Sequence, residues 1–450
     1  MKEYIHSVSL DADRCTGCTT CMKYCPTEAI RVHNGCAQID GSRCIDCGEC
    51  VRHCTSNAKK AVCGLFSQMQ QFKWKIALPA PSLFAQFSGL EDVDYVLQGL
   101  LDIGFDDVFE VARGAEFVSA YTRRYLRTQG VRKPVISSAC PVVERLILLR
   151  FPTLRDNLLP IKPPVEVAAQ MAREQALRAH PELTSGDIGV CFISPCAAKA
   201  SYIKNECGSY KSQVDVVISI SEVYFQLLNV MKHIDVPEIA TCSGMIGLGW
   251  ASIGGETSGL LNDNTISVDG IHQVNEVLEK IENGNIPPVE FIELNACTGG
   301  CVGGVLTIEN PYIAKNRLRQ LRRYMPVSLN VVPTEEAYIP DSVMMEMPEY
   351  VAQHKLGKSI GESMRLMMQI QSIRESLPGI DCGSCGAPTC RAFAEDLVRG
   401  KADINDCIIA YKDIIRKYIT DNERGVQADD RAGAGEPRDN AGADDAGAGA

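Results

Sequence analysis

The sequence predicts an α/β protein in which a central domain lies between two small cysteine-rich modules. From about Trp74 to about Asn330, apolar runs alternate with amphipathic stretches, as strands and helices do in an α/β domain. The segment before this region is turn-rich and dense in cysteine, and a third group of cysteines follows the region. The length of 450 residues is consistent with about three domains. We expect the N-terminal module over 1–72, the central domain over 73–355 and the C-terminal module over 356–424.

The alternation in the central region predicts a parallel or mixed sheet with helices on its faces. The candidate strands are Lys75–Leu78, Val108–Val111, Val135–Ile136, Ile188–Ile193, Val214–Ile220 and Val289–Leu294. The candidate helices between them are Val93–Leu101, Phe117–Leu126, Val142–Leu149, Val165–Arg178 and Ser221–Met231. The end of the chain, 425–450, is mostly Gly, Ala and acidic residues, and we expect it to be a disordered tail.

Composition and charge exclude several classes of protein. Hydrophobic residues make up 45% and charged residues 22% of the chain, which is ordinary for a protein with a substantial core. The net charge of −11 argues against nucleic acid as a partner. No apolar run reaches the length of about 18 residues that a membrane span needs. The first residues lack the apolar core of a secretory signal, so we expect a cytoplasmic protein.

The 21 cysteines point to metal binding. Disulfides are rare in a reducing compartment, the number of cysteines is odd, and the cysteines fall in tight clusters. Two runs of four share one internal spacing, which is C-x2-C-x2-C-x3-C. They are Cys15, Cys18, Cys21 and Cys25, and Cys44, Cys47, Cys50 and Cys54.

This repeated spacing, with a proline after the first run, is typical of two-cluster ferredoxins. In that arrangement three thiolates come from one loop and the fourth from the other run. We therefore assign two [4Fe–4S] clusters, called here cluster 1 (Cys15, Cys18, Cys21 and Cys54) and cluster 2 (Cys44, Cys47, Cys50 and Cys25). A pair of structural zinc sites is the alternative, although zinc commonly uses separated CxxC pairs. Cys36 and Cys63 lie outside both runs, and we expect them to be buried hydrophobic residues.

Four further cysteines are scattered over the central domain but share one setting, because each lies after a predicted strand or in the loop that follows it. They are Cys140, Cys196, Cys297 and Cys301. Ligand sites of open α/β sheets lie beyond the carboxyl ends of strands, so these thiols are expected to meet in one crevice. The alternative is that an isolated cysteine is simply a core residue. We accept that interpretation for two other cysteines of this domain, Cys191 and Cys242. It does not suit Cys297–Cys301, where glycines would let the backbone approach an inorganic cluster.

The segments around these four cysteines resemble the three H-cluster motifs of [FeFe]-hydrogenases. The motifs are Ser138-Ala139-Cys140-Pro141, Ser194-Pro195-Cys196-Ala197-Ala198-Lys199 and Glu293-Leu294-Asn295-Ala296-Cys297-Thr298-Gly299-Gly300-Cys301-Val302-Gly303-Gly304. The resemblance extends from the N-terminal module to about Asn330. It implies that the four cysteines hold a [4Fe–4S] cluster, with Cys301 bridging to a diiron subsite that carries CO, cyanide and an azadithiolate. It further implies that Lys199 interacts with a cyanide, and that Ala80, Pro81 and Ser82 line the same ligands.

Departures from the family pattern indicate a sensory member. Ala139 stands where catalytic members carry the cysteine that relays protons, and a methyl group has no proton to exchange. Ser194 and Asn295 replace methionines, which makes the pocket more polar. The stretch Ser119–Arg123 lacks the usual relay carboxylates, so the standard proton path is interrupted. This pattern resembles the sensory hydrogenases, which keep the cofactor but lose efficient turnover.

The third cysteine group offers four more ligands, Cys382, Cys385, Cys390 and Cys407. It resembles a small helical [4Fe–4S] domain of anaerobic redox proteins, and a zinc site is the alternative. Amphipathic helices are predicted over Lys358–Ser376 and around Ile408–Tyr418. Cys207 has no ligand run around it.

The leading hypothesis is an anaerobic [FeFe]-hydrogenase of low turnover that senses H2 or redox state. Its partners would be H2 and protons, a ferredoxin or signalling protein, and the hydrogenase maturation proteins. Two alternatives remain: a working subunit of a larger complex with another proton path, and an iron–sulfur assembly scaffold without the diiron subsite.

Overall fold

The computed structural model describes residues 4–205, 210–332, 338–348, 356–412 and 415–416. Contacts divide the chain into two units, Met1–Lys355 and Leu356–Ala450. The predictions for Cys207 and for the tail 425–450 lie outside the described residues.

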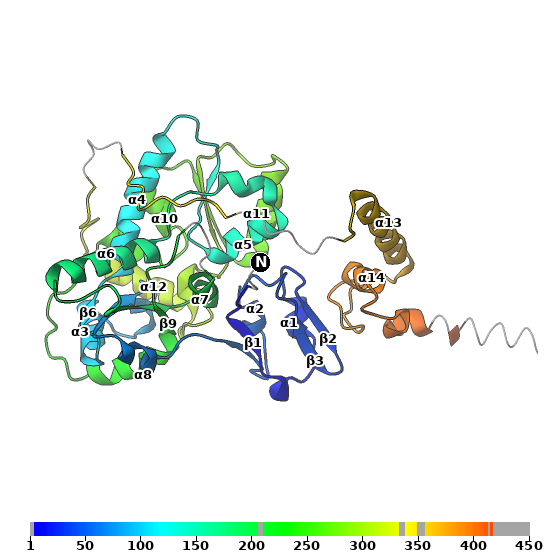
Figure 1. Cartoon of the computed structure of the whole chain (residues 1–450), viewed down its shortest axis with the longest axis horizontal. Helices are drawn as coiled ribbons and strands as arrows, with labels where there is room; N and C mark the ends of the chain where they lie inside the picture. The colour runs from blue at the N-terminus through cyan, green and yellow to red at the C-terminus, as the bar shows by residue number, and fades with distance from the viewer. Residues whose placement is uncertain (1–3, 206–209, 333–337, 349–355, 413–414, 417–450) are drawn as a thin grey trace, which may run out of the picture. The chain divides into compact units, whose positions relative to one another are not determined.

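The N-terminal module consists of two antiparallel strand pairs and two one-turn helices, shown in blue in Figure 1. Its elements are β1 (Val8–Leu10), α1 (Thr20–Lys23), β2 (Ile30–His33), β3 (Cys36–Ile39), α2 (Glu49–Arg52) and β4 (Lys59–Ala61). Strand β1 pairs with β4, and β2 pairs with β3. Each helix begins after a residue of positive φ, Thr19 at 63° and Gly48 at 79°, and carries the third cysteine of its run. The two halves of the repeat therefore fold alike.

The first sheet of the central domain has four parallel strands in the order β6-β5-β8-β9. Their bounds are Asp107–Val108 for β6, Trp74–Pro79 for β5, Ile188–Ser194 for β8 and Val216–Ser219 for β9. Every residue of β8 is buried, as expected for a strand covered on both faces. Ala77 packs with helices α3 (Asp94–Asp102) and α8 (Ile220–Met231), whereas its neighbours Ile76 and Leu78 pack with α6 (Pro164–Ala179).

The second sheet has three parallel strands in the order β10-β11-β7. Strand β7 is Val135–Ile136, β10 is Thr265–Asp269 and β11 is Phe291–Asn295. Helices α5 (Pro141–Arg150) and α11 (Ile271–Glu282) pack on Ile136 and Ile292. The remaining helices of this unit are α4 (Val111–Arg127), α7 (Ala197–Lys204), α9 (Met245–Gly249), α10 (Gly255–Leu260) and α12 (Pro311–Arg322).

These sheets confirm the predicted α/β class and correct several details. The alternation predicted a parallel or mixed sheet, and the structure has two sheets, both parallel. The strand predicted over Val108–Val111 ends at Val108, and Val111 begins α4, whose N-cap is Glu110. Ile220, predicted as the end of a strand, begins α8, because the Ser219 hydroxyl caps that helix.

The second unit is small and helical. Helix α13 (Ile360–Ser376) matches the helix predicted over Lys358–Ser376, and α14 (Cys390–Val398) follows the cysteine loop. Its core contains Leu377, Phe393 and Cys407. The N-cap hydroxyls of Ser359 and Thr389 accept hydrogen bonds from the first turns of α13 and α14.

Candidate metal centre

Four cysteines of the central domain meet at the carboxyl ends of strands from both sheets. Cys140 follows β7 and is the N-cap of α5, and Cys196 follows β8 and is the N-cap of α7. Cys297 lies beyond the end of β11, and Cys301 begins a short 3-10 helix, Cys301–Gly303. The crevice therefore lies at the ends of strands that belong to both sheets, a feature that the order of strands along the sequence does not reveal.

The electrostatics of these thiols are those of a metal site. Burial raises the pKa of Cys196 to about 12 and that of Cys301 to about 11, and it raises the pKa of Cys297 well above its usual range. The thiol of Cys140 raises all three pKa values further, because it lies close to each of them. Thiols in such a place ionise only when a cation compensates the charge, which is what a metal cluster provides.

The glycines between and after the last two cysteines allow close approach of backbone to backbone. A Cβ on Gly300, whose φ is 90°, would lie 2.5 Å from the backbone nitrogen of Ile253. A Cβ on Gly304 would lie 2.1 Å from the carbonyl oxygen of Pro195. The sequence predicted glycines that make room for an inorganic cluster. In the structure they let the loop with Cys301 pack against two other backbone segments, which fixes the position of its thiol.

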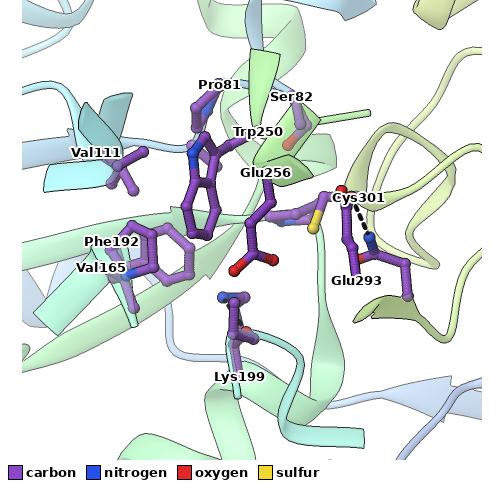
Figure 2. A pocket seen from close by; sticks show the side chains of 17 residues that line it. Pro81, Ser82, Val111, Val165, Phe192, Lys199, Trp250, Glu256, Glu293 and Cys301 are labelled. Atoms are coloured by element: carbon purple, nitrogen blue, oxygen red, sulfur yellow. Dashed lines mark hydrogen bonds between the residues drawn. The ribbon is translucent and has the colours of Figure 1, made fainter. Parts of the chain in front are cut away.

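A small cavity of about 60 Å³ adjoins Cys301 (Figure 2). Most of the predicted pocket residues line it, namely Ala80, Pro81, Ser82, Ala139, Lys199 and Asn295. Ser194 is absent from this lining: its buried hydroxyl accepts a hydrogen bond from the Cys196 amide at 3.1 Å. In the structure the Ser194 hydroxyl shapes the turn that carries Cys196.

Two polar groups that line the cavity can serve a bound polar ligand. The Ser82 hydroxyl is fully buried and has no hydrogen-bond partner among the described residues. The Lys199 ammonium donates to the Ala139 carbonyl at 3.3 Å, which leaves further N–H donors for a ligand. A buried hydroxyl without a partner is costly, so Ser82 fits a site that is completed by a ligand with acceptor atoms.

Glu256 is the principal residue of the cavity that the sequence did not reveal. It belongs to α10, it is almost fully buried, and its carboxyl group points toward the end of the Lys199 side chain (Figure 2). Its Oε2 accepts a 2.6 Å hydrogen bond from the Ser137 hydroxyl, and its Oε1 has no partner among the described residues. Glu256 follows two glycines in a stretch without a motif, so only the folded chain brings it to the cavity.

Burial disfavours ionisation of the Glu256 carboxyl group. Burial raises its pKa well above the usual range, and the nearby carboxyl group of Glu293 raises it further. Glu293 accepts hydrogen bonds from the amides of Gly254 and Thr257 and from the Asn295 side chain at 3.0 Å each, so it is the better stabilised anion of the pair. Glu256 is consequently the member of the pair whose ionisation is less favourable.

The helix α4, where the family places relay carboxylates, presents no acid to the cavity at Ser119–Arg123. Ser119 accepts a 2.9 Å hydrogen bond from the indole of Trp250, which lines the cavity. Arg123 donates to the carbonyl of Gly259 in α10. These residues fix the position of α10 and of Glu256, and none of them carries a proton that exchanges near neutral pH.

In the N-terminal module the thiols group as the spacing predicted. Burial raises the pKa of Cys21, and the thiols of Cys18, Cys15 and Cys54 raise it further. Burial likewise raises the pKa of Cys47 well above its usual range, with Cys25, Cys50 and Cys44 as the thiols that add to the effect. Each fourth cysteine thus lies beside the three thiols of the other run.

The cysteines assigned to cluster 2 include one that lies beside the crevice. Cys47 and Ile45 pack in the same hydrophobic cluster as Cys140 and Cys196. The Arg52 guanidinium donates to the carbonyl of Gly303 at 2.9 Å. The module is therefore fixed to the central domain at the place where Cys47 packs with Cys140 and Cys196.

The second unit has its own site. Cys382, Cys385, Cys390 and Cys407 line one pocket together with Phe393. Burial raises the pKa of Cys385, and the thiols of Cys407 and Cys382 raise it further. The amide of Cys390 donates to the Asp381 carboxylate at 2.6 Å, which holds the start of α14 against the loop.

Several cysteines without an assigned ligand role were predicted to be buried, and the structure confirms this for only some of them. Cys191 is fully buried in β8, as predicted. Cys242 was expected in the core but is exposed, because it lies in the loop before α9, held by its amide to the Glu110 carboxylate at 2.6 Å. Cys36 and Cys63 are half-buried rather than buried.

Comparisons with known proteins agree with this arrangement. A family model for the C-terminal domain of the iron only hydrogenase large subunit matches residues 73–243 and 249–305, just over half of the chain. A model for a 4Fe-4S dicluster domain matches residues 7–55, and one for a putative Fe-S cluster matches residues 377–409.

Individual relatives were also found. The periplasmic [Fe] hydrogenase large subunit of Nitratidesulfovibrio vulgaris is 26% identical over 370 residues, which are 67% of this chain and 86% of the relative. A subunit of the ion-translocating oxidoreductase complex of Thiobacillus denitrificans is 49% identical over 37 residues, which are 8% of this chain and 20% of the relative. A solved variant of [FeFe]-hydrogenase HydA1 from Chlamydomonas reinhardtii aligns with a TM-score of 0.44 and 17% identity, covering 56% of this chain and 84% of that chain. No helix among the described residues is long and apolar enough to span a membrane.

Proposed function

Since the chain belongs to the family of iron-only hydrogenase large subunits, we propose that it binds H2, splits it slowly and reversibly, and serves as a sensor of H2 or redox state. The observation that carries the proposal is the combination at the cavity beside Cys301. Cys301, one of the four clustered thiols, lines that cavity with Lys199 and with the Ser82 hydroxyl, which has no partner among the described residues, while Ala139 provides no exchangeable proton.

The donor set fits an H-cluster. Cys140, Cys196, Cys297 and Cys301 would hold its [4Fe–4S] part, and Cys301 would also reach the diiron subsite in the cavity that it lines. Such a group, when bound, supplies an open iron for H2 and a basic bridgehead amine. Lys199 and Ser82 would donate to cyanide or CO ligands, for which an ammonium and a buried hydroxyl are suited. Ala80, Pro81 and Asn295 would complete the wall around these ligands.

Proton movement would rely on Glu256. Its carboxyl group lines the cavity, accepts a hydrogen bond from Ser137 at Oε2, and leaves Oε1 without a partner among the described residues. A buried acid with a raised pKa can donate its proton and recover one from water. This route would replace the usual relay of protons only in part. Ala139 stands where catalytic members of the family carry the proton-relaying cysteine, so that position has no proton donor. We therefore propose low turnover rather than none.

Electrons would leave the crevice through cluster 2 and then cluster 1. Cys47 of cluster 2 packs with Cys140 and Cys196, which supports transfer from the crevice into the N-terminal module. The four cysteines of the second unit would hold one more [4Fe–4S] cluster, as a contact to a redox partner such as ferredoxin or a signalling protein. We further propose a cytoplasmic, anaerobic protein that receives its diiron subsite from hydrogenase maturation proteins.

A working hydrogenase subunit remains the second candidate, and Glu256 is the observation that favours it. If Glu256 exchanges protons rapidly, the isolated chain turns over H2 rapidly with a ferredoxin. The proposed sensor turns over slowly under the same conditions, so the rate separates the two candidates.

Infrared spectroscopy of the matured chain tests whether the protein carries an H-cluster. An H-cluster gives bands of bound CO and cyanide, and those bands are expected to change when the gas phase is switched between H2 and an inert gas. A chain that holds its iron after maturation but shows no such bands would instead be an iron–sulfur scaffold.

A further inference from the structure

A buried lysine lies among the thiols of the N-terminal module. Lys59 is 3% exposed, and its Nζ has no hydrogen-bond partner among the described residues. The residue opens β4, where it pairs with Leu10 of β1. Burial of an ammonium without a compensating charge is costly, so the position requires an anionic neighbour.

The internal repeat shows that an apolar residue is the ordinary occupant of this position. Ala29 donates its amide to Cys25 Sγ at 3.2 Å, and Ala58 donates its amide to Cys54 Sγ at the same distance. Ile30, which follows Ala29 and opens β2, is 2% exposed. Lys59 occupies the equivalent place after Ala58, so one half of the module has a charge where the other half has a hydrocarbon side chain.

Lys59 lies close to ligands of cluster 1, and its charge acts on two of them. It lowers the pKa of Cys21, against the larger effect of burial, and it also acts on the thiol of Cys15. The backbone amide of Lys59 donates to Cys54 Sγ at 3.5 Å. Three of the four ligands assigned to cluster 1 are therefore near this residue. Lys59 also lowers the pKa of Cys50, a ligand assigned to cluster 2.

We propose that Lys59 is a redox-tuning residue, whose buried ammonium stabilises the reduced state of cluster 1. Electrons that leave the crevice would then reside on cluster 1 in preference to cluster 2. Reduction adds one electron and no proton to the cluster, which makes it more negative. An ammonium within a low-dielectric interior stabilises the more negative state more strongly, so it raises the reduction potential. An isoleucine in the same place would leave the two clusters closer in potential.

This inference rests on the assignment of the two clusters and not on H2 chemistry, so it can be tested on the chain without the diiron subsite. The full chain is reconstituted with its [4Fe–4S] clusters and titrated with dithionite while the reduced clusters are followed by electron paramagnetic resonance. The Cys18→Ser variant, altered at an exposed ligand, identifies the signal of cluster 1.

Lys59→Met removes the charge and keeps the length of the side chain. At a fixed ambient potential we expect the reduced-to-oxidised ratio of cluster 1 to fall about tenfold, which is about 59 mV for a one-electron couple. Lys59→Arg keeps the charge and should keep the ratio near that of the wild type. Lys60→Met is the matched control: it removes the neighbouring exposed charge, which pairs with Asp11 at 2.9 Å, and should leave the ratio unchanged.

Three outcomes would overturn the proposal. The first is an unchanged ratio in Lys59→Met with full iron content. The second is an equal change in Lys60→Met, because that result would mean a general effect of surface charge. The third is loss of iron in both Lys59→Met and Lys59→Ile while Lys59→Arg retains it, because the ammonium would then hold the cluster rather than tune it.

Discussion

Replacing Glu256 by glutamine tests the proposed proton route. Glutamine keeps the size of the side chain, and its amide oxygen can still accept the 2.6 Å hydrogen bond from Ser137, so the cavity should stay intact. The exchangeable carboxyl proton is lost. A positioned acid or base contributes about 10²- to 10⁴-fold to a rate. Glu256 lines the cavity with Cys301, and its Oε1 has no partner among the described residues. We therefore expect H2 production by the matured variant to fall about 100-fold or more.

The assay is H2 evolution with a chemical reductant, with the rate divided by the intensity of the infrared bands so that occupancy of the diiron subsite cancels. Glu144→Gln is the matched control, since Glu144 is a second buried acid with a raised pKa that does not line the cavity. Equal rates in Glu256→Gln and wild type would refute the route. Equal losses in Glu256→Gln and Glu144→Gln would also refute it, because they would indicate a general effect on the fold.

Two further predictions concern Ser82 and Glu144. Ser82→Ala removes a hydroxyl without a protein partner among the described residues, so the free energy of unfolding should stay the same or rise by about 1 kcal/mol. The infrared bands of the matured protein should shift, and unshifted bands would deny contact with the ligands. Burial raises the pKa of Glu144 to about 8. Between the unfolded value near 4.5 and about 8, the folded state binds a proton that the unfolded state lacks, so stability falls as pH rises. From pH 6 to pH 8 the wild type should lose about 2 kcal/mol relative to Glu144→Gln in chemical unfolding, and parallel profiles would contradict this.

Short-range patterns made much of this protein predictable. The spacing of the N-terminal cysteines fixes which thiols share a loop, and the neighbours of Cys21 and Cys47 in the structure agree with the predicted grouping. Strand β7 has only 2 residues, yet Val135 and Ile136 could be identified because a buried parallel strand is a continuous apolar run. Strand β10 escaped notice because Thr265–Asp269 is partly exposed and half polar.

What the sequence could not supply depends on contacts between distant segments. Glu256 reaches the cavity because α10 packs on α4 and β11, and no local pattern encodes that packing. The same holds for the meeting of two sheets at the crevice. Distant contacts also keep a residue out of the core. Cys242 is exposed because hydrogen bonds tie its loop to the buried Glu110, and its sequence neighbours do not reveal this.

The Ala139→Cys variant tests the central claim most directly. Ala139 lines the cavity beside Cys301, and a thiol there would supply the exchangeable proton that the alanine lacks. If this position limits turnover, H2 evolution per installed diiron subsite should rise about 100-fold in the variant. Infrared bands of full intensity with no gain in rate, or with a loss, would contradict the account and assign the slow step to another part of the protein.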